Sequence, residues 1–447
     1  FDLFGLNPPA DEGLAFGQAM SGKLNPYTAN DPQPFKHFDA NKQWFAADGV
    51  PILPIDDAGQ QNAYPLMRVS ASLPAGATVA SLDVVLPVAS EADCQNCHAL
   101  GEVGARDANP NYIFADDPND PNSVLQAAKH NILALHDAEH RTNLLNETPV
   151  LCARCHYSAA LDLAGTGPTV DQTGQPTMSA VMHEHHGELT DPTTGAELFP
   201  TNGTLEQTCY QCHPGKVTKC LRGAMGGAGI DCVDCHGSML AVGRDTREPW
   251  IDEPRCESCH TGDAVNNDGA IRLSQAWSDD IDIATPRLAN NKRFAENKDT
   301  LYRNSLGHGG VACEGCHGST HAIWPNALPT ANDNVAANQL QGHSGSISEC
   351  SVCHTSLPLT LSGPHGMHNV NSRAWNLEHE DFYESNPSAC QACHGRNLEG
   401  TVLSQTAADR VYLRDEEDDD DDDEGGAQTI SVVKGTAVSC DLCHEKP

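Results

Sequence analysis

Nine segments of the sequence place two cysteines and a histidine in the order C-x-x-C-H. They contain 18 of the 19 cysteines, whereas random placement of the same residues would give about 0.04 such motifs. Two thiols three positions apart can add to the two vinyl groups on one edge of a porphyrin, and the imidazole that follows can then ligate the iron. The spacing therefore predicts nine covalently attached haem c groups. The motifs are Cys94–Cys97–His98, Cys152–Cys155–His156, Cys209–Cys212–His213, Cys232–Cys235–His236, Cys256–Cys259–His260, Cys313–Cys316–His317, Cys350–Cys353–His354, Cys390–Cys393–His394 and Cys440–Cys443–His444.

Other uses of these cysteines explain the pattern less well. Zinc sites and disulfide frameworks also use paired cysteines, but neither requires a histidine after every second cysteine. Cys220 stands outside every motif. A lone cysteine is most often a small buried apolar residue, and a reactive or ligating role is the alternative.

The histidines outside the motifs can provide the sixth iron ligands. The chain has 22 histidines, so 22 − 9 = 13 remain for nine irons, whereas the seven methionines are too few to serve every iron. Two histidines per iron would give low reduction potentials and leave no coordination position for a substrate. The predicted sixth ligands are His136, His140, His183, His186, His308, His321, His343, His368 and His379, and no role is assigned to His37, His130, His185 and His365.

Two pairs of these candidates are spaced as neighbours on a helix. A predicted helix over residues 122–146 carries His136 and His140, which are four residues apart and share a face. His183 and His186 are three residues apart and share a face if their segment is helical. Each pair can therefore reach two different haems from one element.

Glycine flanks further candidates. His308 and His343 both follow a glycine, so a flat, bulky ligand can approach the backbone closely there. His365 and His368 lie three residues apart and compete for the same role, and the prediction selects His368.

The first 90 residues contain no haem motif and are rich in Pro, Asn and Asp. Alternation of apolar and polar residues predicts two strands in this region, Met67–Ser72 and Val79–Val88. We therefore predict a haem-free N-terminal region of β-strands and coil over residues 1–90. The alternative is an ordered coil that lies over the haems.

Residues 91–447 form the predicted nonahaem region, with roughly one haem for every forty residues. So few residues cannot enclose each porphyrin separately, so the haems must lie close together and replace much of the side-chain core. We predict a fold class of mostly irregular coil with short α-helices wrapped around a haem chain. Small amounts of β-structure are expected in the N-terminal region and near the C-terminus.

Three short strands are predicted near the C-terminus, at Thr401–Leu403, Val411–Leu413 and Thr429–Val433. The last two flank ten consecutive acidic residues, 415–424. Such a run is normally solvated. A site for Ca²⁺ or another cation is the alternative, although the run lacks the spaced carboxylates of an EF-hand loop.

The composition excludes several classes of partner. The formal net charge is 26 − 61 = −35, which disfavours nucleic acid and anionic membrane surfaces. No stretch of eighteen apolar residues is present, so no transmembrane segment is predicted. The sequence begins at Phe1 without a basic, apolar leader, so we expect the mature form of a protein secreted through the periplasm.

From about residue 30 onward, the sequence resembles the outer-surface multihaem c-type cytochromes of metal-reducing bacteria, including those that polymerise into conductive filaments. The ninth motif departs from this pattern, because similar proteins often carry eight haems or fewer. Besides the motifs, the resemblance rests on the runs Asn30–Phe35, Leu135–Asp137, Cys212–Gly215, Gly309–Cys313, Cys316–Ser319, His321–Pro325 and Gly363–His368.

The resemblance implies an extracellular or cell-surface electron carrier with a continuous chain of bis-histidine haems. Its expected partners are upstream periplasmic or outer-membrane cytochromes, extracellular acceptors such as metal oxides, and copies of itself in a filament. The alternative is a multihaem reductase of nitrogen or sulfur oxyanions with one open iron position. No C-x-x-C-K motif or cluster of proton donors marks one haem as catalytic, so no catalytic residue is predicted.

Overall fold

The chain divides into two compact units. Unit 1 comprises Phe1–Pro65, Leu86–Cys220 and Ser238–Pro249, and unit 2 comprises Leu66–Val85, Leu221–Gly237 and Trp250–Pro447. The first three motifs therefore belong to unit 1 and the other six to unit 2. The computed structural model describes residues 34–41, 43–47, 52, 54, 60–88, 91, 93–105, 117, 119–260, 262–267, 276, 287, 291–414 and 428–443.

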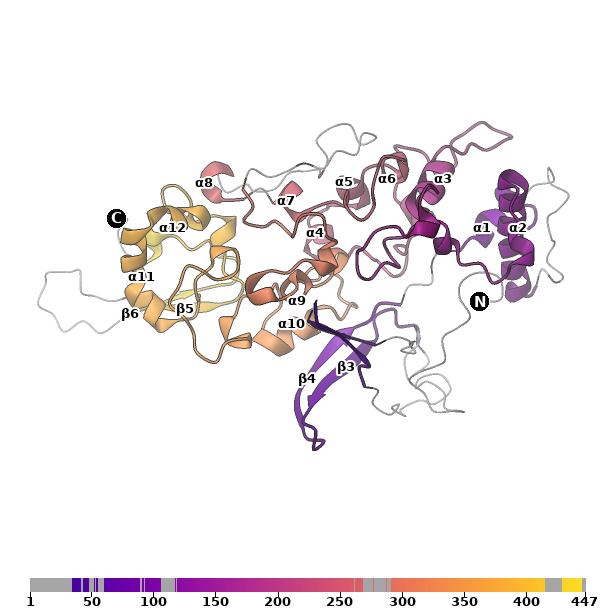
Figure 1. Ribbon diagram of the computed structural model, residues 1–447. Helices are drawn as coiled ribbons and strands as arrows, with labels where there is room; N and C mark the ends of the chain where they lie inside the picture. The colour runs from indigo at the N-terminus through magenta and orange to yellow at the C-terminus, as the bar shows by residue number, and fades with distance from the viewer. Residues whose placement is uncertain are drawn as a thin grey trace, which may run out of the picture. The chain divides into compact units, whose positions relative to one another are not determined.

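Among its described residues, unit 1 consists of short helical turns, coil, the longer helix α2 and a small antiparallel pair of strands (Figure 1). Its elements are β1 (His37–Asp39), β2 (Trp44–Ala46), α1 (Gln95–His98), η1 (Val103–Ala105), α2 (Pro121–His140), η2 (Leu144–Asn146), η3 (Cys152–Arg154), η4 (Val170–Gln172), the π-helix η5 (Ala180–Glu184), α3 (His185–Gly187), η6 (Cys209–Gln211) and α6 (Met239–Gly243).

Unit 2 also consists mainly of short helices and coil, and it contains two small antiparallel pairs of strands. Together the two units confirm the predicted fold class of coil and short helices with little β-structure. The elements of unit 2 are β3 (Leu66–Ser72), β4 (Thr78–Val85), α4 (Ala224–Gly227), α5 (Cys232–His236), α7 (Cys256–Cys259), α8 (Ala264–Asn267), η7 (Tyr302–Asn304), η8 (His308–Gly310), α9 (Cys313–His317), η9 (Thr320–Ala322), α10 (Asn334–Gln341), η10 (Cys350–Val352), η11 (Pro364–Gly366), α11 (Arg373–Ser385), α12 (Pro387–His394), η12 (Val402–Ser404), β5 (Arg410–Arg414), β6 (Gln428–Val432) and η13 (Cys440–Leu442).

Helix α2 confirms the predicted helix but is shorter than expected. It begins at Pro121, whose fixed φ suits the first helical position. The backbone leaves the helix at Arg141, which has a φ of 59°. There the carboxylate of Asp137 accepts hydrogen bonds from the backbone N–H of Leu144 (2.7 Å) and Leu145 (3.1 Å). These bonds replace the helical pattern, so the helix ends before residue 146.

The predicted N-terminal strands are confirmed as the antiparallel hairpin β3–β4. The second strand ends at Val85 rather than Val88. The N–H of Leu86 donates to the carbonyl oxygen of Pro65 (3.0 Å), but proline has no N–H to return the bond, so the ladder is interrupted there. The hairpin lies against α10 (Figure 1), where Gln339 and Asp83 exchange two hydrogen bonds of 2.8 Å.

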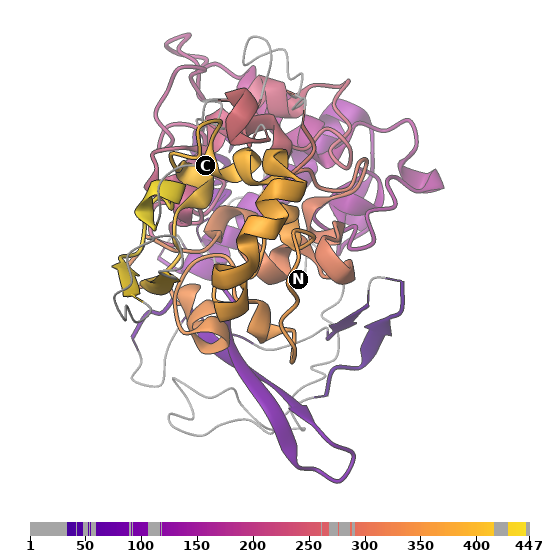
Figure 2. The same cartoon turned by 90° about the vertical axis from the view of Figure 1, so that its left-hand side faces the viewer.

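Near the C-terminus, β5 and β6 confirm two of the three predicted strands, and helix α11 lies beside β5 (Figure 2). The third, Thr401–Leu403, is wrong, because the chain forms a helical turn there. The hydroxyl of Thr401 accepts a hydrogen bond from the N–H of Leu403 (3.1 Å), which closes that turn. The acidic run 415–424 lies outside the described residues.

Side chains alone provide little core among the described residues. Most of the buried apolar residues are alanines, with a few larger ones such as Leu133 and Trp375. Alanine buries little apolar area, so its contribution to stability is small. Specific polar contacts between side chains therefore contribute more to the stability of the fold than usual. The clearest of them is the ion pair of Arg222 and Asp333. Their side chains are 3% and 5% exposed and form two hydrogen bonds of 2.6 and 2.7 Å.

We expect Asp333→Ala to lower the free energy of unfolding by about 3–5 kcal/mol, because the buried guanidinium of Arg222 would lose both hydrogen bonds to the carboxylate of Asp333. Urea unfolding of the haem-loaded protein, followed by far-UV circular dichroism, measures this change. The exposed pair of Arg68 and Asp83 is the control. Arg68→Gln should change the midpoint little, and equal effects of the two variants would contradict the prediction.

Candidate functional site

The described residues of each motif lie in a helical turn, and in the first eight motifs, whose histidines are described, this turn brings the two cysteines and the histidine close together. The backbone N–H of the motif histidine donates to the carbonyl oxygen of the first cysteine, as in His98 to Cys94 (2.9 Å) and His213 to Cys209 (2.8 Å). The structure describes every motif cysteine; none is buried and none forms a disulfide. The thiols are thus placed for attachment to a group that lies over the turn.

In unit 1, every motif histidine faces a second imidazole from a distant part of the chain. The ring centres of His98 and His186 are 6.5 Å apart. His156 lies 6.3 Å from His136 of α2, and His213 lies 5.9 Å from His183. The three motifs of this unit thus each have one imidazole opposite.

Four motif histidines of unit 2 have the same arrangement. The ring-centre distances are 6.3 Å for His236 and His321, 5.9 Å for His317 and His365, 6.1 Å for His354 and His308, and 6.4 Å for His394 and His368.

These distances fit a bis-histidine haem iron. An imidazole nitrogen binds a metal at about 2.0 Å and lies about 1.1 Å from its ring centre, so two rings on opposite sides of one ion have centres about 6.2 Å apart. The seven observed distances, 5.9–6.5 Å, scatter around that value. Among the described residues, no group of three or more His, Cys, Asp or Glu side chains is arranged to hold a bare metal ion. The donor set therefore suits a metal whose other ligands come from a porphyrin.

Hydrogen bonds hold several of these rings in the tautomer that a metal requires. Nδ1 of His186 donates to the carbonyl oxygen of Met182 (2.6 Å), and Nδ1 of His183 donates to that of Ser179 (2.9 Å). A carbonyl oxygen can only accept, so the proton is on Nδ1 and the lone pair is on Nε2. The same bond is made by His156 to Pro176, His365 to Arg293 and His394 to Val438.

Burial keeps these imidazoles neutral. Loss of hydration lowers the pKa of His98, His183, His317 and His368 to about 4. At pH 7 the four rings are therefore unprotonated, which is the form that can ligate iron.

One turn carries two of the opposed imidazoles. His183 lies in the π-helix η5 and His186 in α3, which follows it directly. The two rings face His213 and His98, the histidines of the third and first motifs. Helix α6 packs against this turn so closely that a β-carbon at Gly243 would fall on the backbone of Glu184. His183 and His186 thus lie on one face as expected, but the segment that carries them includes a π-helical turn, which is wider than a turn of α-helix.

Glycine-flanked turns carry two imidazoles of unit 2. His308 lies between Gly307 and Gly309, and Gly309 has a φ of 65°. His365 itself has a φ of 56°, an uncommon conformation for a residue with a side chain. Both turns project a ring from a short, exposed loop.

The remaining predicted ligands with described positions have neighbours other than a motif histidine. The ring of His140 lies 4.7 Å from that of His136. Nε2 of His343 lies 3.1 Å from a carboxylate oxygen of Glu349. Nδ1 of His379 contacts the carbonyl oxygen of Asn376 (3.0 Å). These three assignments stay predictions, and His444 lies outside the described residues.

His365 is the residue that the sequence analysis left aside and that the structure brings opposite a motif histidine. A signal was present, because His365 lies in a Gly-Pro-His-Gly turn and only three residues from His368. The two residues do not compete, since His365 faces His317 and His368 faces His394.

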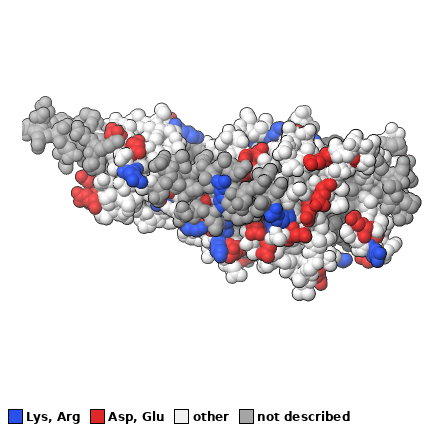
Figure 3. All heavy atoms as spheres, turned by 90° about the horizontal axis from the view of Figure 1, so that it is seen from above, with Lys and Arg blue, Asp and Glu red and all other residues white. Residues whose placement is uncertain are grey.

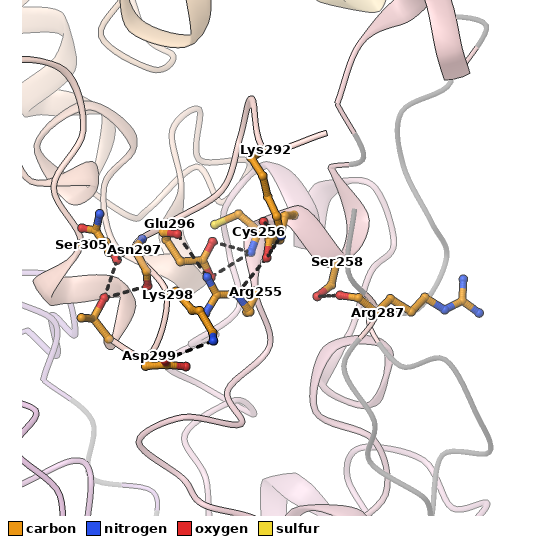
Figure 4. A network of polar contacts seen from close by, with 12 residues as sticks. Arg255, Cys256, Ser258, Arg287, Lys292, Glu296, Asn297, Lys298, Asp299 and Ser305 are labelled. Carbon is orange, nitrogen blue, oxygen red and sulfur yellow. Dashed lines mark hydrogen bonds and ion pairs between the residues drawn. The ribbon is translucent and has the colours of Figure 1, made fainter. Parts of the chain in front are cut away.

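A buried polar network supports the fifth motif. The fully buried carboxylate of Glu257 accepts hydrogen bonds from Arg255 (3.1 Å) and Lys292 (3.0 Å). The carboxylate of Glu296 accepts a bond from the backbone N–H of Cys256 (3.0 Å), as Figure 4 shows. The first cysteine of this motif is therefore fixed through its backbone.

The surface does not show one uniform charge. On the face drawn in Figure 3, acidic and basic side chains of the described residues are interspersed, in spite of the formal net charge of −35.

Residues 229–406 match a family model described as outer membrane cytochrome MtrC/MtrF-like, domains II/IV. The match covers five of the nine motifs, from Cys232 to His394. It confirms the predicted resemblance to extracellular multihaem cytochromes of metal-reducing bacteria. It also supports covalently bound haem c, electron transfer and a location at or outside the cell surface. Comparisons with curated proteins and with solved structures give no match. Within the described residues, no helix has the length and apolar character needed to cross a membrane.

We expect Gly243→Ala to destabilise the protein by about 1–3 kcal/mol, because its methyl group would force α6 away from the turn that carries His183 and His186. Thermal unfolding of the haem-loaded protein measures this loss. Gly315→Ala is the control, since its methyl group would meet only the end of the Val311 side chain at 3.3 Å. A smaller loss at Gly243 than at Gly315 would contradict the prediction.

Proposed function

Because residues 229–406 match the outer membrane cytochrome family, we propose that this chain is an extracellular electron-transfer cytochrome with nine bis-histidine haems. We further propose that it acts as a subunit of a conductive filament. The observation that carries the electron-transfer role is the set of opposed imidazoles, with ring centres 5.9–6.5 Å apart. A haem iron ligated on both faces has no position for a substrate, so its remaining chemistry is electron exchange.

The cysteines of each motif would tether one haem, and the motif histidine would be its first axial ligand. The opposed imidazoles supply the second ligand for seven haems. The proposed pairs are His98 with His186, His156 with His136, His213 with His183, His236 with His321, His317 with His365, His354 with His308 and His394 with His368. For the motifs of His260 and His444, we propose the candidates of the same unit that these pairs leave, His343 and His379, and His140 is assigned to no motif.

The chain itself supports close spacing of the haems. Bound haem c supplies a one-electron iron couple. His183 and His186 belong to one turn and face two different motifs, so this turn holds two sites side by side. His365 and His368 do the same for the sixth and eighth motifs. Covalent tethers and short linking turns keep such sites in fixed positions, as transfer between fixed centres requires.

An exposed aromatic cluster supports self-association. Phe38 and Phe45 of the β1–β2 hairpin are 55% and 66% exposed, and their ring centres are 4.8 Å apart. Phe35 adds a third ring 6.3 Å from Phe45. Grouped exposed aromatic side chains are typical of protein–protein interfaces. We propose that this cluster contributes to the contact between subunits.

We expect His183→Ala to open one iron position and bind about one CO per chain after reduction. The optical CO-difference spectrum measures this binding, and the wild type should bind almost none. His130→Ala is the control, because His130 is not one of the seven imidazoles that face a motif histidine. Ready CO binding by the wild-type protein would instead favour a reductase with an open iron.

We expect the double change Phe38→Ser and Phe45→Ser to abolish filaments, because it removes most of the exposed aromatic cluster. Negative-stain electron microscopy of purified protein measures assembly. Val170→Ser is the control, since Val170 is an isolated apolar residue that is 89% exposed. Single particles in the wild-type sample would argue against the filament, and unchanged filaments in the double variant would argue against this interface. Intact mass spectrometry of the same sample counts the attached haems.

A further inference from the structure

The seven opposed imidazole pairs fall into two groups by the angle between their ring planes. Two pairs are nearly parallel, with 2° between His183 and His213 and 12° between His368 and His394. The other five pairs have planes crossed at 53–80°. Different structural features must therefore fix the rings in the two groups.

The ring of His368 lies in a stack of aromatic side chains. The indole of Trp375 is parallel to it, at a centre distance of 4.2 Å and an angle of 7°. Trp375 is 9% exposed and lies near the start of α11, where its backbone N–H donates to the hydroxyl of Ser372 (3.2 Å). Phe382 from the same helix packs on Trp375 at 4.9 Å. The indole is thus held in place independently of the imidazole.

Hydrogen bonding does not explain the orientation of this ring. Nδ1 of His368 is buried near the backbone of Asn369 and makes no hydrogen bond of normal geometry with the described residues. By contrast, Nδ1 of His183, in the other parallel pair, donates to the carbonyl oxygen of Ser179 (2.9 Å). Rotation of the His368 ring about its Cβ–Cγ bond is therefore limited by the flat face of the indole.

We propose that Trp375 is a positioning residue that keeps the His368 ring parallel to that of His394, and so sets the electronic character of the iron at the eighth motif. This inference rests on the proposed bis-histidine ligation. When two axial imidazoles are parallel, both donate π-electron density to the same iron d orbital and split it from its partner. When the rings are crossed, the two orbitals receive similar donation and stay close in energy.

The electron paramagnetic resonance (EPR) spectrum of the oxidised protein separates these two cases. Parallel pairs give a rhombic low-spin spectrum with three resolved features, and crossed pairs give a strongly anisotropic one. In Trp375→Leu we expect the rhombic component to fall by about one iron per chain, with a matching gain in the anisotropic component. Binding of CO should not increase, because His368 stays a ligand.

Trp375→Phe keeps an aromatic face and should preserve the wild-type spectrum. Phe382→Leu is the matched control, since it loosens the same packing but leaves the indole against His368. If Trp375→Leu does not fold, Trp375→Met replaces it, because methionine fills the space without a flat ring.

An unchanged rhombic component in the Leu and Met variants, or an equal loss in Phe382→Leu, would overturn the proposal. A high-spin spectrum of the wild-type protein would instead overturn the bis-histidine ligation from which it starts. The two failures are therefore distinguishable in one set of measurements.

Discussion

The opposition of two imidazoles across a gap of fixed width is the constraint on which the rest of this structure depends. Edge-to-face packing also allows ring centres this far apart, but the same spacing recurs at seven motif histidines, as two axial ligands of one iron would require. The backbone helps to maintain the gap through hydrogen bonds at Nδ1 and through the turns that orient each ring. A group held between the two rings, as proposed above, accounts for this arrangement.

The poor side-chain core follows from the same constraint. Alanine forms most of the buried apolar set, and aromatic residues make up only 5% of the chain. A group as large as a porphyrin, held between two rings and tethered at two cysteines, would bury far more apolar area than those alanines do. Buried polar contacts add to the stability of the fold, among them the Arg222–Asp333 ion pair and the Glu257 network.

Irregular backbone orients several of the imidazoles that face a motif histidine. A π-helical turn at 180–184, a left-handed residue at His365 and a glycine-rich turn at His308 each direct a ring in a way that a regular helix or strand does not. Such backbone conformations persist only when the surrounding structure stabilises them. At the π-helical turn, the backbone of Glu184 packs so closely on Gly243 that a methyl group would not fit. The low content of regular helix and strand, which defines the fold class, thus also helps to orient these imidazoles.

The sequence by itself determined the nine C-x-x-C-H motifs, the surplus of histidines and the class of fold, because two thiols and an imidazole in one short segment are a local signal. It also located α2 and the β3–β4 hairpin, whose periodicity is local as well. It did not determine that residues 401–403 turn helically, since a single hydroxyl–backbone bond decides this. Nor could it determine which second imidazole faces which motif. His321 follows His317 by four residues yet faces His236, and His365 rather than His321 faces His317. Only the tertiary structure decides these pairings, because they join segments far apart in the chain.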